Sequence, residues 1–156
     1  SMGTQIKTFI TNPVLIAGLT SWFLAQFIKT IISLTGHKIH NAGELFESLC
    51  LKTGGLPSSH TALVVSVCTT IGFRSGINSD VFLLAFCFTM VTCRDAFGVR
   101  RANGLQAKKL NEIGNELKTK DLIEYEQVKE VNGHTPLEVV VGGVLGLFVG
   151  IGFSVL

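Results

Sequence analysis

Two short motifs each place a histidine at the start of an apolar stretch, in opposite halves of a chain of 156 residues. Residues 54–60 read Gly-Gly-Leu-Pro-Ser-Ser-His, and residues 133–138 read Gly-His-Thr-Pro-Leu-Glu. Between them, residues 94–101 read Arg-Asp-Ala-Phe-Gly-Val-Arg-Arg. Imidazoles act as nucleophiles or move protons, and the planar guanidinium of arginine suits phosphate oxygens. These groups beside apolar segments indicate phosphate chemistry at a membrane surface.

The second motif admits two interpretations that are compatible with each other. Glu138 is placed to hold one ring nitrogen of His134, which leaves the other nitrogen free to attack. Thr135 and Glu138 also form a capping-box pattern for a helix that begins near Pro136. A carboxylate has two oxygens, so Glu138 can serve both purposes.

The first motif predicts an anion-binding helix start. Gly54 and Gly55 permit close approach of the backbone, and the free N–H groups of a helix N-terminus attract anions. Ser58 and Ser59 either donate to phosphate or cap the helix. His60, in the first apolar turn, is either functional or an ordinary interfacial histidine, and the surrounding motif favours the functional role.

Four basic residues and one carboxylate complete the candidate site. Arg94, Arg100 and Arg101 either bind phosphate or form a cluster that meets lipid headgroups. Asp95 either orients an arginine or ligates a metal ion. Lys29 shares a helical face with other polar side chains, so it either faces the protein interior or extends to the membrane interface.

Four apolar segments are expected to position these groups. They cover residues 13–34, 57–77, 80–93 and 136–156, with a capping turn at residues 78–80 and a short amphipathic turn near residues 44–51. If the helices alternate in direction, the end of the first, the start of the second, the end of the third and the start of the fourth lie together. The candidate residues would then gather at one membrane face.

Composition agrees with a single membrane domain over residues 1–156. Hydrophobic residues make up 47% of the chain and charged residues only 15%, which is a membrane-like balance. Residues 94–133 form a polar excursion whose charge spacing predicts a solvated helix, or a helical hairpin interrupted near Gly114. Ser1 before Met2 resembles a tag remnant, and residues 1–3 are expected to be partly tag or disordered. The net charge of +2 gives no reason to expect nucleic acid as a partner.

Two further patterns bear on packing and metals. Gly142, Gly146 and Gly150 form a small-residue stripe that predicts close helix packing, against an internal helix or in a homodimer. The four cysteines show no metal-ligand or redox spacing. No metal site and no cofactor are expected.

The three motifs together resemble a known superfamily. Residues 57–60 are similar to the Pro-Ser-Gly-His motif of the type-2 phosphatidic acid phosphatase superfamily, which includes vanadium haloperoxidases, and His134 with Glu138 resembles its His-x-x-x-Asp motif. More closely, residues 54–60, 95–101 and 133–139 together resemble the pattern of its divergent, mostly bacterial and plastid branch. The resemblance covers nearly the whole chain from residue 25 onward. It implies a helical bundle and a metal-independent phosphatase, with His134 as the nucleophile, Glu138 as its orienting carboxylate and His60 as the general acid.

The sequence departs from the superfamily pattern at two phosphate-binding arginines. Gly36 and Val128 stand at the positions where the superfamily has them. Arg100 and Arg101, with Arg94, are expected to replace them.

The function expected from these observations is hydrolysis of a lipid phosphate or isoprenyl (pyro)phosphate by an all-α integral membrane bundle of about four apolar helices. The expected substrate is a membrane lipid. The alternatives are a non-catalytic membrane protein that binds anionic lipid or a partner, and a phosphotransferase with Mg²⁺ held by Asp95 and Glu138. Because the polar loops beside the site hold most of the basic residues, the positive-inside rule predicts a cytoplasmic active face or its organellar equivalent.

Overall fold

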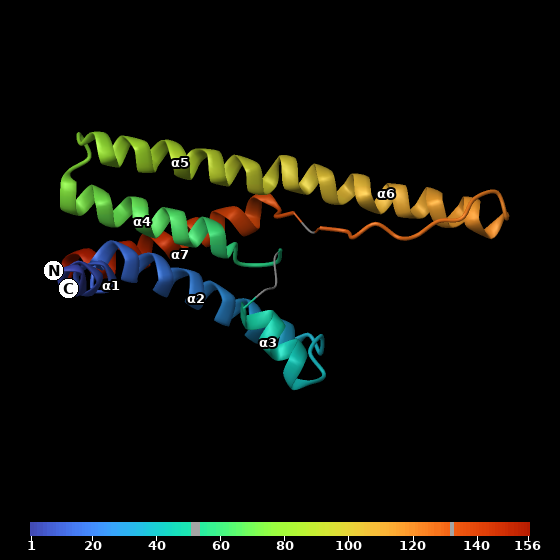
Figure 1. The fold of residues 1–156 in the computed structure, drawn as a ribbon, viewed down its shortest axis with the longest axis horizontal. Helices are drawn as coiled ribbons and strands as arrows, with labels where there is room; N and C mark the ends of the chain where they lie inside the picture. Colours follow the sequence, from blue (N-terminus) through green and yellow to red (C-terminus); the bar gives the residue numbers. More distant parts are fainter. Residues whose placement is uncertain (51–53, 132) are drawn as a thin grey trace.

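The computed structural model describes residues 1–50, 54–131 and 133–156, which form seven helices and no strand. The helices are α1 (Met2–Ile10), α2 (Pro13–Thr35), α3 (Ala42–Cys50), α4 (Ser59–Ser75), α5 (Asp80–Phe97), α6 (Val99–Thr119) and α7 (Pro136–Val155). Figure 1 shows α2, α4, α5 and α7 running side by side in one bundle. The all-α bundle predicted from the sequence is confirmed.

Side-chain caps start the bundle helices where the sequence signals predicted. Asn12 caps α2 ahead of Pro13, and Ser79 caps α5. The second apolar segment starts slightly later than predicted, because Ser58 rather than Pro57 precedes the helix and caps it. In each case the side-chain oxygen accepts a hydrogen bond from a backbone N–H that has no partner inside the helix.

Helix α4 packs against each of the other bundle helices, α2, α5 and α7, and most extensively against α7. It buries mainly small and polar side chains, which allow neighbouring helices to approach closely. On the α2 side, the Ser21 hydroxyl donates a hydrogen bond of 2.9 Å to the carbonyl oxygen of Ala62.

The glycine stripe of α7 also packs against α4, where Gly146 reaches the same Ala62 carbonyl oxygen that accepts from Ser21. Gly142 is buried against Ser58, the cap of α4, and Gly146 and Gly150 are buried against Ala62 and Ser66 of α4. The predicted close packing is therefore with an internal helix. A homodimer through the same stripe would require α4 to leave it.

Three helical segments of the described residues are long and apolar enough to cross a membrane. They are Pro13–Thr35, Pro136–Val155 and the run Asp80–Thr119, which joins α5 and α6. Helix α4 has 17 residues and lies among the other three. The four predicted apolar segments are all helical, but a count of four membrane-crossing helices is not established.

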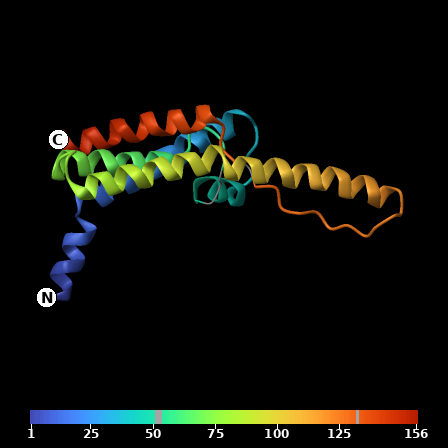
Figure 2. The same ribbon diagram turned by 90° about the horizontal axis from the view of Figure 1, so that it is seen from above.

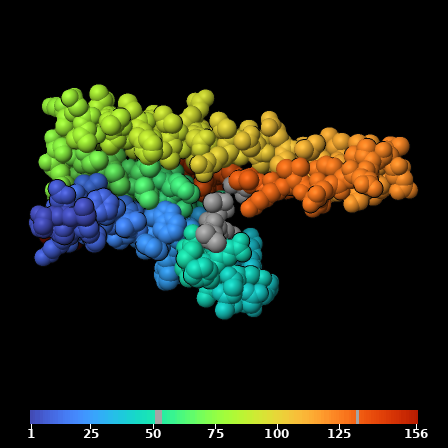
Figure 3. Space-filling view, viewed as in Figure 1, coloured from blue at the N-terminus to red at the C-terminus, as the bar shows by residue number. Residues whose placement is uncertain are grey.

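The polar excursion forms an arm that projects beyond the bundle. Helix α6 continues in the direction of α5, and the chain then returns along it without regular structure (Figures 1 and 2). Figure 3 shows the arm extending well past the other helices. The 21 residues of α6 correspond to a length of about 30 Å.

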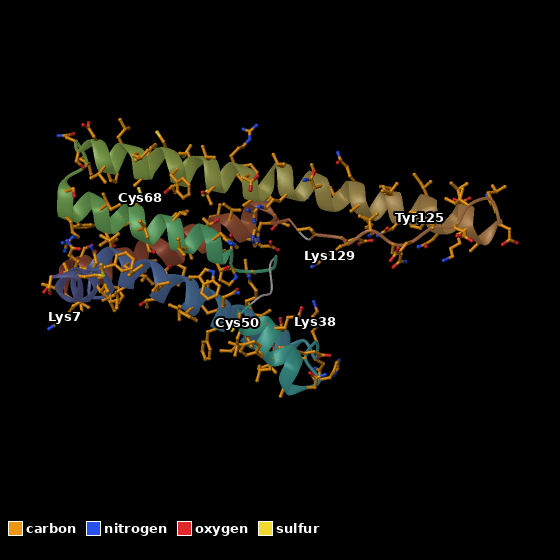
Figure 4. The ribbon with its side chains drawn as sticks, viewed as in Figure 1. Lys7, Lys38, Cys50, Cys68, Tyr125 and Lys129 are labelled. Atoms are coloured by element: carbon orange, nitrogen blue, oxygen red, sulfur yellow. The ribbon has the colours of Figure 1, made fainter. Side chains whose placement is uncertain are left out.

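The arm is held together by a polar contact at its centre. The Asn111 side chain accepts hydrogen bonds from the Tyr125 hydroxyl, at 2.7 Å, and from the backbone N–H of Val128, at 2.9 Å. The Tyr125 ring points toward α6 (Figure 4) and covers Gly114, where a β-carbon would collide with it. The predicted helix is confirmed as far as Thr119, but the charged residues from 120 to 131 are not helical. A hairpin interrupted at Gly114 is wrong, because this glycine lies inside α6 and makes room for the ring.

Two of the smaller predictions, for residues 1–3 and for residues 44–51, compare with the structure as follows. Helix α1 begins at Met2, so only Ser1 of residues 1–3 lies outside a helix. The amphipathic turn predicted near residues 44–51 corresponds to α3, although Leu51 lies outside the described residues. Residues 52, 53 and 132 also lie outside them.

Candidate active site

The alternating helix directions bring the three sequence motifs to one end of the bundle. The C-terminal ends of α2 and α5 and the N-terminal starts of α4 and α7 lie there, while both chain termini lie at the other end (Figure 1). This arrangement is the one predicted from the order of the apolar segments.

His134 and Glu138 form a hydrogen-bonded pair at the start of α7. The Nδ1 atom of His134 lies 3.1 Å from the Glu138 Oε2 atom, and the His134 side chain is almost completely buried. The same Oε2 atom accepts a hydrogen bond of 3.1 Å from the backbone N–H of Thr135, and the Thr135 hydroxyl accepts one from the Glu138 N–H. The capping box and the orientation of His134 therefore coexist, through one shared oxygen.

Two backbone hydrogen bonds tie the motifs to each other. The N–H of His134 donates to the carbonyl oxygen of Ala96 at the end of α5, at 3.1 Å. The N–H of Ser58 donates to the carbonyl oxygen of Glu138, at 3.0 Å. Because these contacts join backbone atoms, the three motifs have a defined position relative to one another.

The first motif forms a tight turn followed by a capped helix. Gly54 and Gly55 have φ values of 81° and 83°, in the left-handed region that favours glycine. Ser58 and Ser59 are buried, and the Ser58 hydroxyl caps α4 and lies 3.0 Å from the Thr61 hydroxyl. Ser58 thus has the capping role that the sequence left open.

His60 and Lys29 complete the centre of the site. His60 is exposed in the first turn of α4, within electrostatic range of His134 and Lys29. Lys29 is buried in α2 with 3% exposure, and its stem carbons lie 3.9 Å from the position that a β-carbon on Gly55 would occupy. Of the two predicted placements, Lys29 takes the interior one, beside the glycine turn.

The environment of His134 favours the neutral form of its imidazole. Burial lowers the pKa of the His134 imidazole, and the positive charges of Lys29 and Arg100 lower it further, while Glu138 acts in the opposite direction. A neutral imidazole has a free electron pair on one nitrogen, as a nucleophile requires.

The three arginines occupy different positions. The Nε atom of Arg100 donates to the Asp95 Oδ2 atom at 2.7 Å, and its charge acts on both histidines. Arg94 and Arg101 are exposed, and neither is among the charges that act on the histidines. The Arg101 backbone instead lies against Gly133.

The carboxylates proposed as Mg²⁺ ligands under the alternative function have other partners. Asp95 pairs with Arg100 and Glu138 with His134. Within the described residues, no three or more His, Cys, Asp or Glu side chains group closely enough to hold a metal ion.

Two structural contributions were not identified from the sequence. The carbonyl oxygen of Ala96 anchors the backbone of His134, and the Asn111–Tyr125 contact holds the segment that leads to it. Ala96 lies inside the Arg-Asp-Ala motif, so its place in that motif could have indicated that it belongs to the site. Asn111 and Tyr125 carry no local pattern, because their contact joins residues 14 positions apart.

Comparison with known proteins gives results consistent with these motifs. The chain matches the Divergent PAP2 family over residues 10–149, a range that contains all three motifs. It is 34% identical over 149 residues to a protein of Bacillus subtilis (strain 168) named "Uncharacterized membrane protein YuiD", with 88% of this chain and 91% of that protein covered. No solved structure matches the chain significantly. The chain is thus a helical membrane protein that belongs to the Divergent PAP2 family.

Proposed function

We propose that this protein is a membrane phosphatase that hydrolyses a lipid phosphate or an isoprenyl (pyro)phosphate through a phosphohistidine. The main support is the His134–Glu138 pair, in which the Nδ1 atom of a buried imidazole faces a carboxylate oxygen at 3.1 Å. This contact keeps the proton on Nδ1 and leaves Nε2 as the nucleophilic nitrogen. A solely structural histidine would have no need of a second, exposed histidine on the neighbouring helix.

The proposed reaction has two steps. The Nε2 atom of His134 attacks phosphorus, the bond between phosphorus and the leaving oxygen breaks, and His60 donates a proton to that oxygen. Water then attacks the phosphohistidine, His60 accepts a proton from it, and inorganic phosphate leaves while His134 regains its free electron pair. The second step restores both histidines to their starting forms.

Positive groups from three elements would stabilise the negative charge of the phosphoryl group. Lys29 lies in α2, Arg100 lies in α6, and the backbone around Gly54 and Gly55 precedes α4. Fixed charges and backbone N–H groups stabilise developing charge most effectively where water is largely excluded. The paired Asp95 side chain would hold the Arg100 fork in one orientation.

The membrane setting supports a substrate with an apolar tail. The candidate site lies at the end of helices whose outer faces are apolar and exposed, so a lipid can enter sideways from the bilayer with its headgroup at the site. Lys38 and Lys129 lie toward that end of the molecule and Lys7 at the other (Figure 4). This distribution of basic residues favours a cytoplasmic active face, or its organellar equivalent.

Phosphate release from purified protein in detergent tests this function. The panel comprises phosphatidate, phosphatidylglycerophosphate and isoprenyl phosphates, each measured with the wild type and with His134→Ala, with and without a chelator. Release by the wild type alone, unchanged in chelator, supports the proposal. Release that the chelator abolishes would favour the Mg²⁺-dependent phosphotransferase, and binding of anionic lipid without release would favour the non-catalytic protein.

A further inference from the structure

One glycine of the α7 stripe lies at the junction between the two histidine motifs. Gly142 follows Glu138 by one helical turn, so both face the same side of α7. Both contact Ser58: the Ser58 N–H donates to the Glu138 carbonyl oxygen at 3.0 Å. A β-carbon on Gly142 would collide with the Ser58 carbonyl oxygen and would lie only 3.1 Å from the Ser58 nitrogen.

This junction links the two histidines through a short stretch of backbone. Ser58 is the cap of α4, two residues before His60. On the α7 side of the junction, the Glu138 carboxylate is hydrogen-bonded to the His134 ring. A collision with backbone atoms cannot be relieved by rotating a side chain, so a β-carbon at position 142 must push the start of α7 away from the start of α4.

We propose that Gly142 is a positioning residue that sets the distance between His60 and His134. Its catalytic consequence rests on the proposed phosphatase function, while its structural consequence does not. Gly142→Ala would lengthen or break the hydrogen bond from Ser58 to Glu138 and separate the two histidines. The local geometry of each motif would be retained, because the Ser58 cap and the Thr135–Glu138 capping box are each made within four residues of the chain.

The same helix provides matched control variants. A β-carbon on Gly150 would lie 2.9 Å from the Ser66 carbonyl oxygen and 2.7 Å from the Thr69 β-carbon, so Gly150→Ala also collides with α4. It lies eight residues further along the helix, about 12 Å from Gly142. Gly152 has no atom within 4 Å of its β-carbon position, so Gly152→Ala controls for the substitution itself.

Steady-state kinetics separate positioning from general destabilisation. For Gly142→Ala we expect kcat to fall on the order of 10²-fold, the loss that a misplacement of about 1 Å can cause. KM should change little, because Lys29 and Arg100 are not on α7. Gly150→Ala should lower the thermal midpoint in detergent but keep most of its kcat, and Gly152→Ala should resemble the wild type.

Hydrogen exchange of the Ser58 amide gives a readout that does not depend on activity. Its N–H is protected by the bond to Glu138, so exchange should accelerate in Gly142→Ala and stay slow in Gly150→Ala. Gly146 lies between Gly142 and Gly150, and a β-carbon there would collide with the Ala62 carbonyl oxygen. If Gly142→Ala proves too unstable, Gly146→Ala should therefore lose more kcat than Gly150→Ala.

The possible outcomes are distinct. Equal losses of kcat in Gly142→Ala and Gly150→Ala, or slow Ser58 exchange in both, would overturn the positioning role. If the wild type releases no phosphate from any substrate but Ser58 exchange accelerates only in Gly142→Ala, the junction is supported and the phosphatase function is rejected.

Discussion

Replacing Glu138 by glutamine tests how a single carboxylate oxygen serves two donors. In the structure, Oε2 accepts from both the Thr135 N–H and the His134 Nδ1–H, each at 3.1 Å. A glutamine side chain can place its carbonyl oxygen at that position, so both hydrogen bonds can persist. Glu138→Gln therefore removes the negative charge while keeping the geometry.

The expected loss follows from the difference between charged and neutral hydrogen bonds. A bond to a charged group contributes about 1.5–3 kcal/mol and a neutral one about 0.5–1.5 kcal/mol. A difference of about 1–1.5 kcal/mol, applied to the developing positive charge on His134, lowers kcat roughly tenfold. Glu138→Ala leaves two donors without an acceptor and should cost about 1–3 kcal/mol of stability, together with most of the activity.

The pH dependence of kcat/KM tests the role of the Glu138 charge independently of the size of the rate loss. Glu138 raises the pKa of His134 against the larger lowering effect of burial. Removing that carboxylate lowers the pKa further, so the acidic limb of the kcat/KM profile should move to lower pH in Glu138→Gln. The assay is phosphate release between pH 4 and pH 9, a range that spans the ordinary histidine pKa of about 6.5. The control variant is Glu124→Gln, which removes a carboxylate from the exposed arm.

Two results would refute this reasoning. An unchanged rate and pH profile in Glu138→Gln would mean that Glu138 only caps α7. A loss as complete as that of His134→Ala would mean that the hydrogen bonds do not survive the substitution, and that the shared-oxygen geometry does not describe the working site.

Three further predictions concern the remaining groups. His60→Ala should slow hydrolysis of an alkyl phosphate by about 10²–10⁴-fold but an activated aryl phosphate much less, since a good leaving group needs no proton; equal losses in phosphate-release assays would make His60 structural. Arg100→Lys should lower kcat/KM because lysine lacks the planar fork, whereas Arg101→Lys should have the smaller effect because the Arg101 charge is not among those that act on the histidines, and the reverse order would exclude Arg100 as the phosphate ligand. In intact cells, an impermeant thiol reagent should label a cysteine introduced at Gly76 and not one at Asn115, and the opposite labelling would reverse the proposed topology.

The helical frame and the meeting of the motifs could be predicted because local signals define both. Asn12, Ser79 and Thr135 are strong caps at the starts of apolar segments. With the segment limits known, alternation of direction brings the motifs to one end. The capping box at Thr135 and Glu138 also fixed the relation between His134 and its carboxylate, since these residues are one helical turn apart.

Contacts between distant segments could not be predicted in the same way. Gly114 looks like a helix breaker in the sequence, but the Tyr125 ring occupies the space that its missing side chain leaves. The sequence predicted that Asp95 could orient an arginine, but it did not indicate which one, since Asp95 and Arg100 are five residues apart and would point in different directions on one continuous helix. They pair because α5 ends at Phe97 and α6 begins at Val99, and this break decides that Arg100 acts on the histidines.

Rapid-quench trapping of phosphate on the protein tests the phosphohistidine mechanism most directly. After mixing with a lipid phosphate carrying labelled phosphorus, the wild type should hold acid-labile, base-stable label at His134 in a peptide map, because a phosphorus–nitrogen bond joins the phosphoryl group to the imidazole. His134→Ala should hold none. Equal labelling of His134→Ala, or turnover by the wild type with no labelled histidine at any quench time, would contradict His134 as the nucleophile.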